Sequence, residues 1–197
     1  KFDKTESIEV SGTTYSIQRI HDATTDSIRF IGTSPDDKFV EILISPTAEL
    51  VASRKALREQ YPTYFPKLIA HENADEYTAA VFELGTNGHT LVNELAQARS
   101  NRAVNDCADL CETVALPILK VLADIHDSGL ALSVHNPAEV WVGENGHILL
   151  LNCPLITPTE KPEENRVNPS FSPPEAYGRC GGLLGSRADV FFAGMIM

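Results

Sequence analysis

Residues 125–154 read IHDSGLALSVHNPAEVWVGENGHILLLNCP, and this stretch decides the fold. A helical pattern of apolar residues ends just before Gly129, which suits the left-handed residue that often follows a helix. Two apolar segments, 140–142 and 148–151, flank Gly146 and predict two short strands joined by a turn. The stretch therefore predicts a helix end, a loop and a strand pair in direct succession.

The same stretch resembles the catalytic loop of protein kinases. In that family a Leu-His pair and a glycine precede His-Arg-Asp, a proline follows it, and two strands lead to Asp-Phe-Gly. The framework residues of this pattern are present here, and they are Ile125, His126, Gly129, Pro137 and the Gly146 turn. The resemblance therefore covers the positions that shape the loop.

The reactive positions of the pattern hold different residues. Leu132-Ser133-Val134 replaces His-Arg-Asp, so Val134 stands at the position of the catalytic base and cannot accept a proton. Glu139 replaces the metal-binding Asn, and Asn152 replaces the metal-binding Asp of Asp-Phe-Gly. The chain is therefore similar to a pseudokinase, a protein kinase domain that has lost its catalytic residues.

The sequence before the glycine-containing segment 85–88 is typical of a β-rich unit. Segments rich in β-branched and aromatic residues alternate there with polar turns. One segment, 47–60, has helical spacing instead, with Thr47 as the expected N-cap. We expect strands at 15–20, 27–32, 38–45, 65–71 and 76–84.

The sequence after 85–88 is typical of helices. Residues 90–98 form a short helical segment, and apolar residues recur at three- and four-residue spacing through 106–126. Pro117 lies inside the longer pattern and is expected to kink the helix or to divide it. Residues 186–191 resemble the start of the buried central helix of a kinase C-lobe.

The resemblance implies an α+β, protein kinase-like bilobal fold. Residues 1–84 would form the small β-rich N-lobe, and residues 85–197 would form a mainly helical C-lobe. A complete kinase C-lobe continues for several more helices, so this C-lobe is expected to be truncated after the start of its central helix. A longer polypeptide or another subunit would then complete it.

The phosphate-binding positions of a kinase also hold unsuitable residues. The turn before the second strand has no glycine, and its Asp22 and Asp26 would place negative charge near the phosphates. On the third strand the resemblance places Leu43 at the lysine position, or Ile42 in the other register, so an aliphatic residue stands where an ammonium is needed. Lys38 precedes this strand and is expected to be a solvated charge.

Other positions of the pattern keep residues suited to structural roles. Kinases use two acids to anchor the activation segment and the catalytic-loop backbone, and the resemblance places Glu175 and Asp189 at these positions. Leu132 and Cys153 replace the histidine and the phenylalanine of the hydrophobic spine and are apolar enough to pack. The resemblance therefore implies a domain that retains its framework.

The candidate metal ligands do not make a complete site. Cys107 and Cys111 are four residues apart on a helical pattern, as are His135 and Glu139, and either pair would supply half a site. The two cysteines fall on the apolar stripe, which favours core packing. Glu139 has the chemistry to hold one Mg²⁺, but a surface carboxylate is the favoured interpretation. We therefore expect no metal and no cofactor.

The charge of the chain disfavours two classes of partner. Its 197 residues carry a formal net charge of -11, whereas nucleic acids and anionic membranes attract clustered Lys and Arg. Apolar runs are also shorter than the roughly 20 residues that span a membrane. The 4 cysteines are irregularly spaced, which favours a reduced, cytoplasmic setting.

These observations predict a protein without enzymatic activity. Pseudokinases commonly bind and control active kinases or organise assemblies. The resemblance therefore implies a regulatory or scaffolding module whose partners are proteins, either an active kinase or a multi-subunit assembly. Two alternatives stay open, a structural subunit of a larger assembly and a divergent ATP-binding kinase with displaced catalytic residues.

Overall fold

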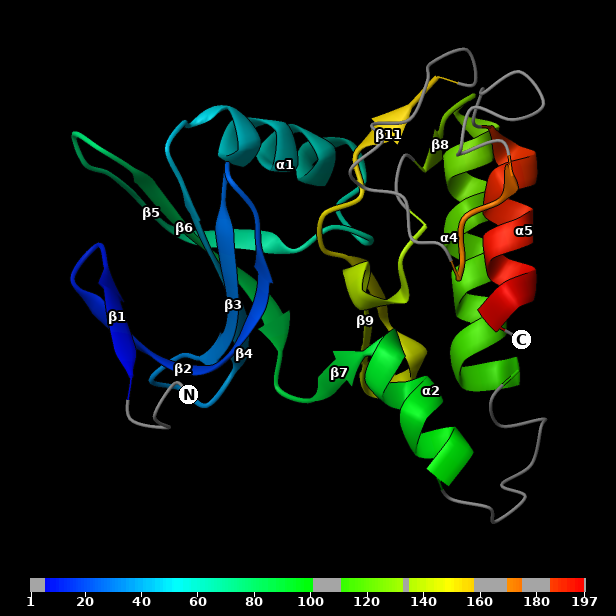
Figure 1. The fold of residues 1–197 in the computed structure, drawn as a ribbon, viewed down its shortest axis with the longest axis horizontal. Coiled ribbons are helices and arrows are strands. Elements are labelled where there is room, and N and C mark those ends of the chain that lie inside the picture. The colour runs from blue at the N-terminus through cyan, green and yellow to red at the C-terminus, as the bar shows by residue number, and fades with distance from the viewer. Residues whose placement is uncertain (1–5, 101–110, 133–134, 158–169, 175–184, 197) are drawn as a thin grey trace. The chain divides into compact units, whose positions relative to one another are not determined.

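The computed structural model describes residues 6–100, 111–132, 135–157, 170–174 and 185–196. The chain divides into two compact units, Lys1–Gly88 and His89–Met197. The described residues form a mixed α/β structure, with a curled antiparallel sheet in the first unit and helices with small sheets in the second (Figure 1).

A six-stranded antiparallel sheet in the order β1-β2-β3-β4-β6-β5 makes up most of the first unit. All the strands expected from the sequence are present, and β1 is an additional strand that the sequence analysis did not indicate. Helix α1 (Glu49–Gln60) connects β4 to β5. The strands are β1 (Ser7–Val10), β2 (Thr13–Ala23), β3 (Ile28–Thr33), β4 (Phe39–Ser45), β5 (Lys67–Asn73) and β6 (Thr78–Gly85).

Helix α1 begins at Glu49 without a side-chain cap. Its N-cap residue is Ala48, so the prediction of Thr47 as N-cap was wrong. Ser45 Oγ accepts a hydrogen bond from Thr47 N at 3.3 Å, so the turn before the helix is closed by a different side chain. The backbone of Thr47 belongs to this turn, and the helix starts two positions beyond it.

The two faces of the sheet bury separate apolar clusters. Successive side chains of a strand point to opposite faces, and β4 supplies both clusters in this way, with Ile42 on one face and Leu43 on the other. On the second face Leu43 packs with Ala80, Phe82 and Val51 of α1. The first face buries Val10, Tyr15, Phe30, Val40, Ile42, Ala79 and Val81.

The sheet curls so that the turn after β1 meets β5 (Figure 1). Ser11 N donates to Glu72 Oε2 at 2.7 Å, and Ser11 Oγ donates to the backbone oxygen of His71 at 2.7 Å. Ser11 and Gly12 both have positive φ, 51° and 76°, as a tight two-residue hairpin turn requires. These contacts tie the two outermost strands of the sheet to each other.

The second unit combines helices with two small sheets. One sheet has the order β10-β9-β7, and the other pairs β11 with β8. The predicted strand pair at 140–142 and 148–151 is confirmed as β9 and β10, which pair antiparallel. The elements are β7 (Gly88–Thr90), α2 (Leu91–Ser100), α4 (Leu116–Asp127), β8 (Ala131–Leu132), β9 (Val140–Gly143), β10 (Ile148–Leu150), β11 (Leu155–Ile156) and α5 (Ser186–Ile196).

Helix α4 begins next to Pro117, as expected for a proline that divides a helical pattern. A π-helical turn, Cys111–Ala115, precedes it, and Pro117 lies in the first turn of α4, where its missing N–H is tolerated. The helix ends before Gly129, whose φ of 73° confirms the predicted left-handed residue. The part of the pattern at 106–110 lies outside the described residues.

Helices α4 and α5 lie side by side in the second unit (Figure 1). The buried residues of the two helices include Val121 and Ile125 of α4 and Phe192 of α5. None of the helices among the described residues is both long enough and apolar enough to cross a membrane.

Candidate functional site

A cluster of buried charges joins the sheet of the first unit to α1. Glu41 of β4 accepts hydrogen bonds through both carboxylate oxygens. Arg29 Nη1 of β3 donates to Oε1 at 3.0 Å, and Arg54 Nη2 of α1 donates to Oε2. The side chains of Arg29 and Glu41 are 0% exposed and that of Arg54 is 5% exposed. We call these three residues the arginine–glutamate cluster.

The strand register places these side chains on the face that α1 covers. Arg29 lies opposite Leu43 and Ile31 lies opposite Glu41, so Arg29 and Glu41 are diagonal neighbours on one face of the sheet. Glu41 also lies opposite Phe82 of β6, and the Arg54 guanidinium carbon is 3.9 Å from the centre of the Phe82 ring. The Arg54 charge is thus stabilised by a carboxylate and by an aromatic face.

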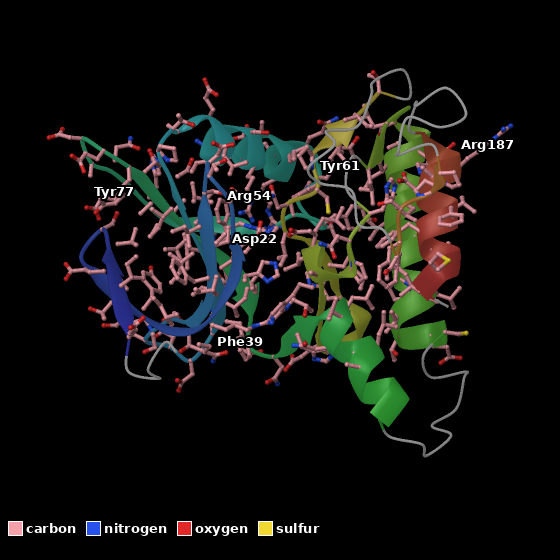
Figure 2. All side chains as sticks on the ribbon, viewed as in Figure 1. Asp22, Phe39, Arg54, Tyr61, Tyr77 and Arg187 are labelled. Carbon is pink, nitrogen blue, oxygen red and sulfur yellow. The ribbon has the colours of Figure 1, made fainter. Side chains whose placement is uncertain are left out.

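A fourth charge lies at the edge of the cluster. Asp22 of β2 is the direct cross-strand partner of Arg29, and its Oδ2 lies 3.5 Å from Arg29 Nη2. Unlike the other three side chains, that of Asp22 is 41% exposed. Figure 2 labels Asp22 and Arg54 in the same part of the first unit. Buried charges require such pairing, because an unpaired one would lose its hydration without compensation.

The residue predicted at the lysine position lies beside this cluster and not in it. Leu43 is 0% exposed and packs in the apolar cluster under α1, while Ile42, the other register, packs on the opposite face. The charge that contacts α1 comes from Glu41, two residues earlier on the same face. The cluster was not predicted from the sequence, although a single acid within an apolar strand is a signal, because a buried Glu requires a partner.

Lys38 is partly exposed and carries an ion pair that was not expected. Its Nζ donates to Glu83 Oε1 at 2.8 Å, with side-chain exposures of 43% and 30%. This hydrogen bond, followed by the attraction of the Glu83 charge, raises the pKa of the Lys38 ammonium. Lys38 is therefore held at the sheet surface and takes no part in the arginine–glutamate cluster.

In the second unit, Asp189 holds the loop that follows α4. Its Oδ2 accepts hydrogen bonds from Leu132 N at 3.1 Å and from His126 Nε2 at 2.7 Å. Its Oδ1 accepts from His135 Nε2 at 2.8 Å. Asp189 is 0% exposed, and because a carboxylate only accepts, each imidazole carries its proton on Nε2. The prediction that Asp189 anchors the loop backbone is confirmed by the contact with Leu132.

The ring of His135 extends this anchor into the core. Its centroid lies 5.7 Å from that of Phe192 of α5, which in turn makes an edge-on contact with Phe171 at 6.4 Å. His135 is 2% exposed. The sequence analysis considered His135 only as half of a metal site with Glu139, and the structure gives it a structural partner instead.

The other kinase-like positions are filled by packed side chains. Leu132 and Cys153 are 1% and 2% exposed, which confirms the prediction that both pack in the interior. Glu139 is 7% exposed, so the interpretation as a surface carboxylate was wrong. Its backbone oxygen accepts from Leu151 N at 2.8 Å, which holds the short helical turn at 137–139 against the residue that follows β10. Asn152 is half-buried.

Three of the predicted positions lie outside the described residues, namely Val134, Glu175 and Cys107. Cys111 is exposed, so the expectation that it packs in the core was wrong. It lies in the π-helical turn, whose wider repeat displaces it from the stripe that α4 buries.

Among the described residues, no group of three or more His, Cys, Asp or Glu side chains is arranged to hold a metal ion.

Two comparisons of the chain, with protein-family models and with curated proteins, gave no match. No protein-family model matches the chain, and no curated protein matches its sequence. The resemblance to protein kinases therefore rests on the residues of this chain alone.

Proposed function

We propose that this chain is a catalytically inactive, protein kinase-like domain of bilobal fold that acts as a regulatory or scaffolding module for protein partners. The element order supports the proposal: strands, one helix and two more strands in the first unit, then helices around a loop and a strand pair. The backbone contact from Leu132 to Asp189 supports it as well, because it is the contact that the resemblance implies for the central helix.

One observation carries the inactive part of the proposal. In active kinases a strand lysine pairs with a helix glutamate, and the lysine also contacts the nucleotide phosphates. Here the charges are reversed, with Glu41 on the strand and Arg54 on the helix. Glu41 is fully buried between two guanidinium groups, so β4 offers a phosphate no ammonium. The helix is held against the sheet by this reversed pair.

The remaining chemical positions agree with that interpretation. Mg²⁺ in kinases is held by an Asp and an Asn beside the phosphates. The corresponding residues here are Asn152, which has no charge, and Glu139, which is buried. Asp22, which the resemblance placed in the turn that covers the phosphates, lies near the end of β2, and its carboxylate contacts Arg29. Together these side chains favour a folded domain in which the transfer of phosphate has been lost.

A thermal-unfolding titration with Mg²⁺-ATP tests the proposal. A ligand present at 100 times its dissociation constant stabilises the folded state by about 2.7 kcal/mol, which is easily measured as a shift in Tm. We expect no shift with millimolar Mg²⁺-ATP, and no incorporation of labelled phosphate into general kinase substrates, with an active kinase domain measured in parallel. Phosphate incorporation would refute the inactive assignment, and a Tm shift alone would favour the divergent ATP-binding kinase.

A second candidate function, a structural subunit of a larger assembly, is favoured by the surface of α5. Val190, Phe191 and Met195 are 59%, 41% and 49% exposed, and large apolar side chains exposed together are typical of protein contacts. Purification of the tagged chain from its native source at two salt concentrations separates the candidates. A regulatory module is expected to lose its partner at high salt or on dilution, whereas a structural subunit is expected to stay in a complex of constant composition.

A further inference from the structure

One face of the six-stranded sheet is only partly covered at the end where β2 turns into β3. The strand register places Ala23, Ile28, Ile44 and Ala79 in one row across β2, β3, β4 and β6. Ile44 packs against the apolar cluster that contains Ala79, so this row is the border of that cluster. Although β3 is an inner strand, Ile28 is 40% exposed. The apolar face therefore continues into solvent at this end of the sheet.

Tyr77 adds an aromatic side chain to the same border. Ala74 N donates to Tyr77 O at 2.8 Å, so the pairing of β5 with β6 continues as far as Tyr77. Tyr77 precedes Ala79 by two residues, and alternate residues of a strand share a face of the sheet. Its side chain therefore lies on the face of Ala79, and Tyr77 is 42% exposed. We call Ile28, Ile44 and Tyr77 the isoleucine–tyrosine strip.

The turns at the two ends of the strip carry negative charge. The turn between β2 and β3 contains Asp26, and the turn between β5 and β6 contains Asp75 and Glu76. All three residues are exposed. Residues 20–28 and 72–79 contain no Lys or Arg. An exposed apolar row is thus bounded by acids on both sides, and a partner that covers it without repulsion carries positive charge beside an apolar surface.

The spacing of the strip fits an α-helix that lies across the strands. Neighbouring strands are about 4.8 Å apart, and one helical turn rises about 5.4 Å. Apolar residues on successive turns of one helix face can therefore contact Ile28, Ile44 and Ala79 in order, with Tyr77 beside the last of them. A second copy of this chain is a poor occupant, because each copy carries a formal net charge of -11.

We propose that the isoleucine–tyrosine strip is a docking surface for a basic, amphipathic helix of a partner protein. The apolar face of the helix covers the strip, and its Lys and Arg side chains lie over the acidic turns. This inference rests on the protein-binding part of the proposed function and names the chemistry of the partner. It does not depend on the loss of catalysis, so the Mg²⁺-ATP titration and the test of the strip fail by different results.

Three synthetic peptides test the surface. The first is a helix of Leu and Lys with one apolar face, the second has Glu in place of every Lys, and the third is the Leu/Lys composition in an order without an apolar face. Each is titrated at low salt into the full chain, and the methyl resonances of Ile28 and Ile44 report where it binds. Sedimentation of the chain without peptide measures self-association.

Two variants test the apolar contact. Ile28→Thr with Tyr77→Thr removes the two exposed ends of the strip and keeps β-branched residues in the strands. Ile69→Thr is the matched control, because Ile69 is also 40% exposed but lies on β5, three strands away from β3. Urea unfolding of each variant confirms that it is folded.

Two further variants test the charge. Asp75→Asn with Glu76→Gln removes two charges from one side of the strip. Asp36→Asn with Asp37→Asn removes two charges from the exposed turn between β3 and β4, at the opposite end of the sheet. Asn tolerates the φ of 57° at Asp37, so this control keeps its backbone.

We expect the Leu/Lys helix to bind the wild-type chain saturably and the other two peptides to bind at least about tenfold more weakly. The Ile28/Tyr77 variant should bind about tenfold more weakly than the wild type, and Ile69→Thr within about twofold of it. Removal of Asp75 and Glu76 charges should weaken binding about threefold or more, and more than removal of the Asp36 and Asp37 charges.

The proposal is overturned if the peptide without an apolar face binds as tightly as the helix, or if either control loses as much affinity as its matched variant. Absence of saturable binding, or methyl resonances that do not move, would overturn it as well. A dimer that dissociates in the Ile28/Tyr77 variant would identify a second copy as the occupant instead. If a partner purified from the native source stays bound to this variant, the strip is not its docking surface, while the protein-binding function stands.

Discussion

The buried charges of the first unit make a sharp prediction about stability. Replacing Glu41 by Gln keeps the shape of the side chain and removes the charge that holds Arg29 and Arg54. Both guanidinium groups then remain buried without the carboxylate that they share, and the neighbouring Asp22 is 41% exposed. Removal of one partner from a buried ion pair costs about 3–5 kcal/mol, so we expect the free energy of unfolding to fall by that amount. For a domain stabilised by about 5–15 kcal/mol, this is a large fraction.

Two further variants separate the buried charge from other effects. The triple variant Arg29→Met, Glu41→Leu, Arg54→Met replaces the whole cluster by apolar side chains of similar volume, and such exchanges are often neutral or stabilising by about 1–4 kcal/mol. Glu83→Gln removes the partly exposed partner of Lys38 and should cost much less than Glu41→Gln, because ion pairs in contact with water contribute little. We therefore expect the triple variant to be the most stable of the three, followed by Glu83→Gln and then by Glu41→Gln.

Urea unfolding followed by circular dichroism measures all of these variants. The slope of the free energy with urea should be the same in each, so that the midpoints report stability directly. The reasoning would be refuted if Glu41→Gln cost less than about 1 kcal/mol, the range of an exposed pair. It would also be refuted if the triple variant lost as much as Glu41→Gln, because the cost would then come from packing and not from unpaired charge.

Three other predictions use the same unfolding assay. In Gly146→Ala the new Cβ would lie 2.7 Å from a backbone oxygen at φ 71°, so it should cost clearly more than Gly12→Ala, where φ is 76° but the space is open and only the left-handed cost of about 1–2 kcal/mol applies. Asp189→Asn turns an acceptor of three hydrogen bonds, two of them buried, partly into a donor and should cost about 2–3 kcal/mol, with faster amide exchange in the loop after α4; unchanged exchange would contradict the anchor. Because the pKa of Lys38 is raised by Glu83, the stability difference between wild type and Glu83→Gln should be complete from neutral pH to about pH 10 and shrink as the pH rises through the Lys38 pKa, and a difference that does not shrink at alkaline pH would contradict the assignment.

The elements whose signals are local were predicted well from the sequence. Strands β2 to β6 follow from runs of β-branched and aromatic residues, and α4 ends where Gly129 provides a left-handed residue. β1 was missed because its four residues, SIEV, are stabilised by pairing with β2 and by the contacts of Ser11 with β5. Short edge strands carry little propensity of their own, and tertiary contacts decide whether they form.

In the candidate site, too, some contacts were predicted from the sequence and others depend on tertiary structure. A resemblance in motif order was enough to predict that Asp189 would hold the backbone at Leu132, because both positions belong to one pattern. The role of His135 was not predicted, because it depends on α5 placing Asp189 and Phe192 next to the imidazole ring. No spacing in the sequence specifies this placement. For the same reason the burial of Glu139 could not be predicted, because the backbone contact of Glu139 with Leu151 forms only in the folded chain.

The sequence by itself determined the order of strands and helices, the turns at Gly129 and Gly146, and which residue types stand at the positions that the kinase resemblance compares, because these depend on residue type and local spacing. Only the tertiary structure decided that Glu41 would lie between Arg29 and Arg54, and that Asp22 would lie at the solvent edge of this cluster. The physical reason is that a charge buried in a sheet is tolerated only with its partners in place, and these partners come from two other strands and a helix that folding brings together.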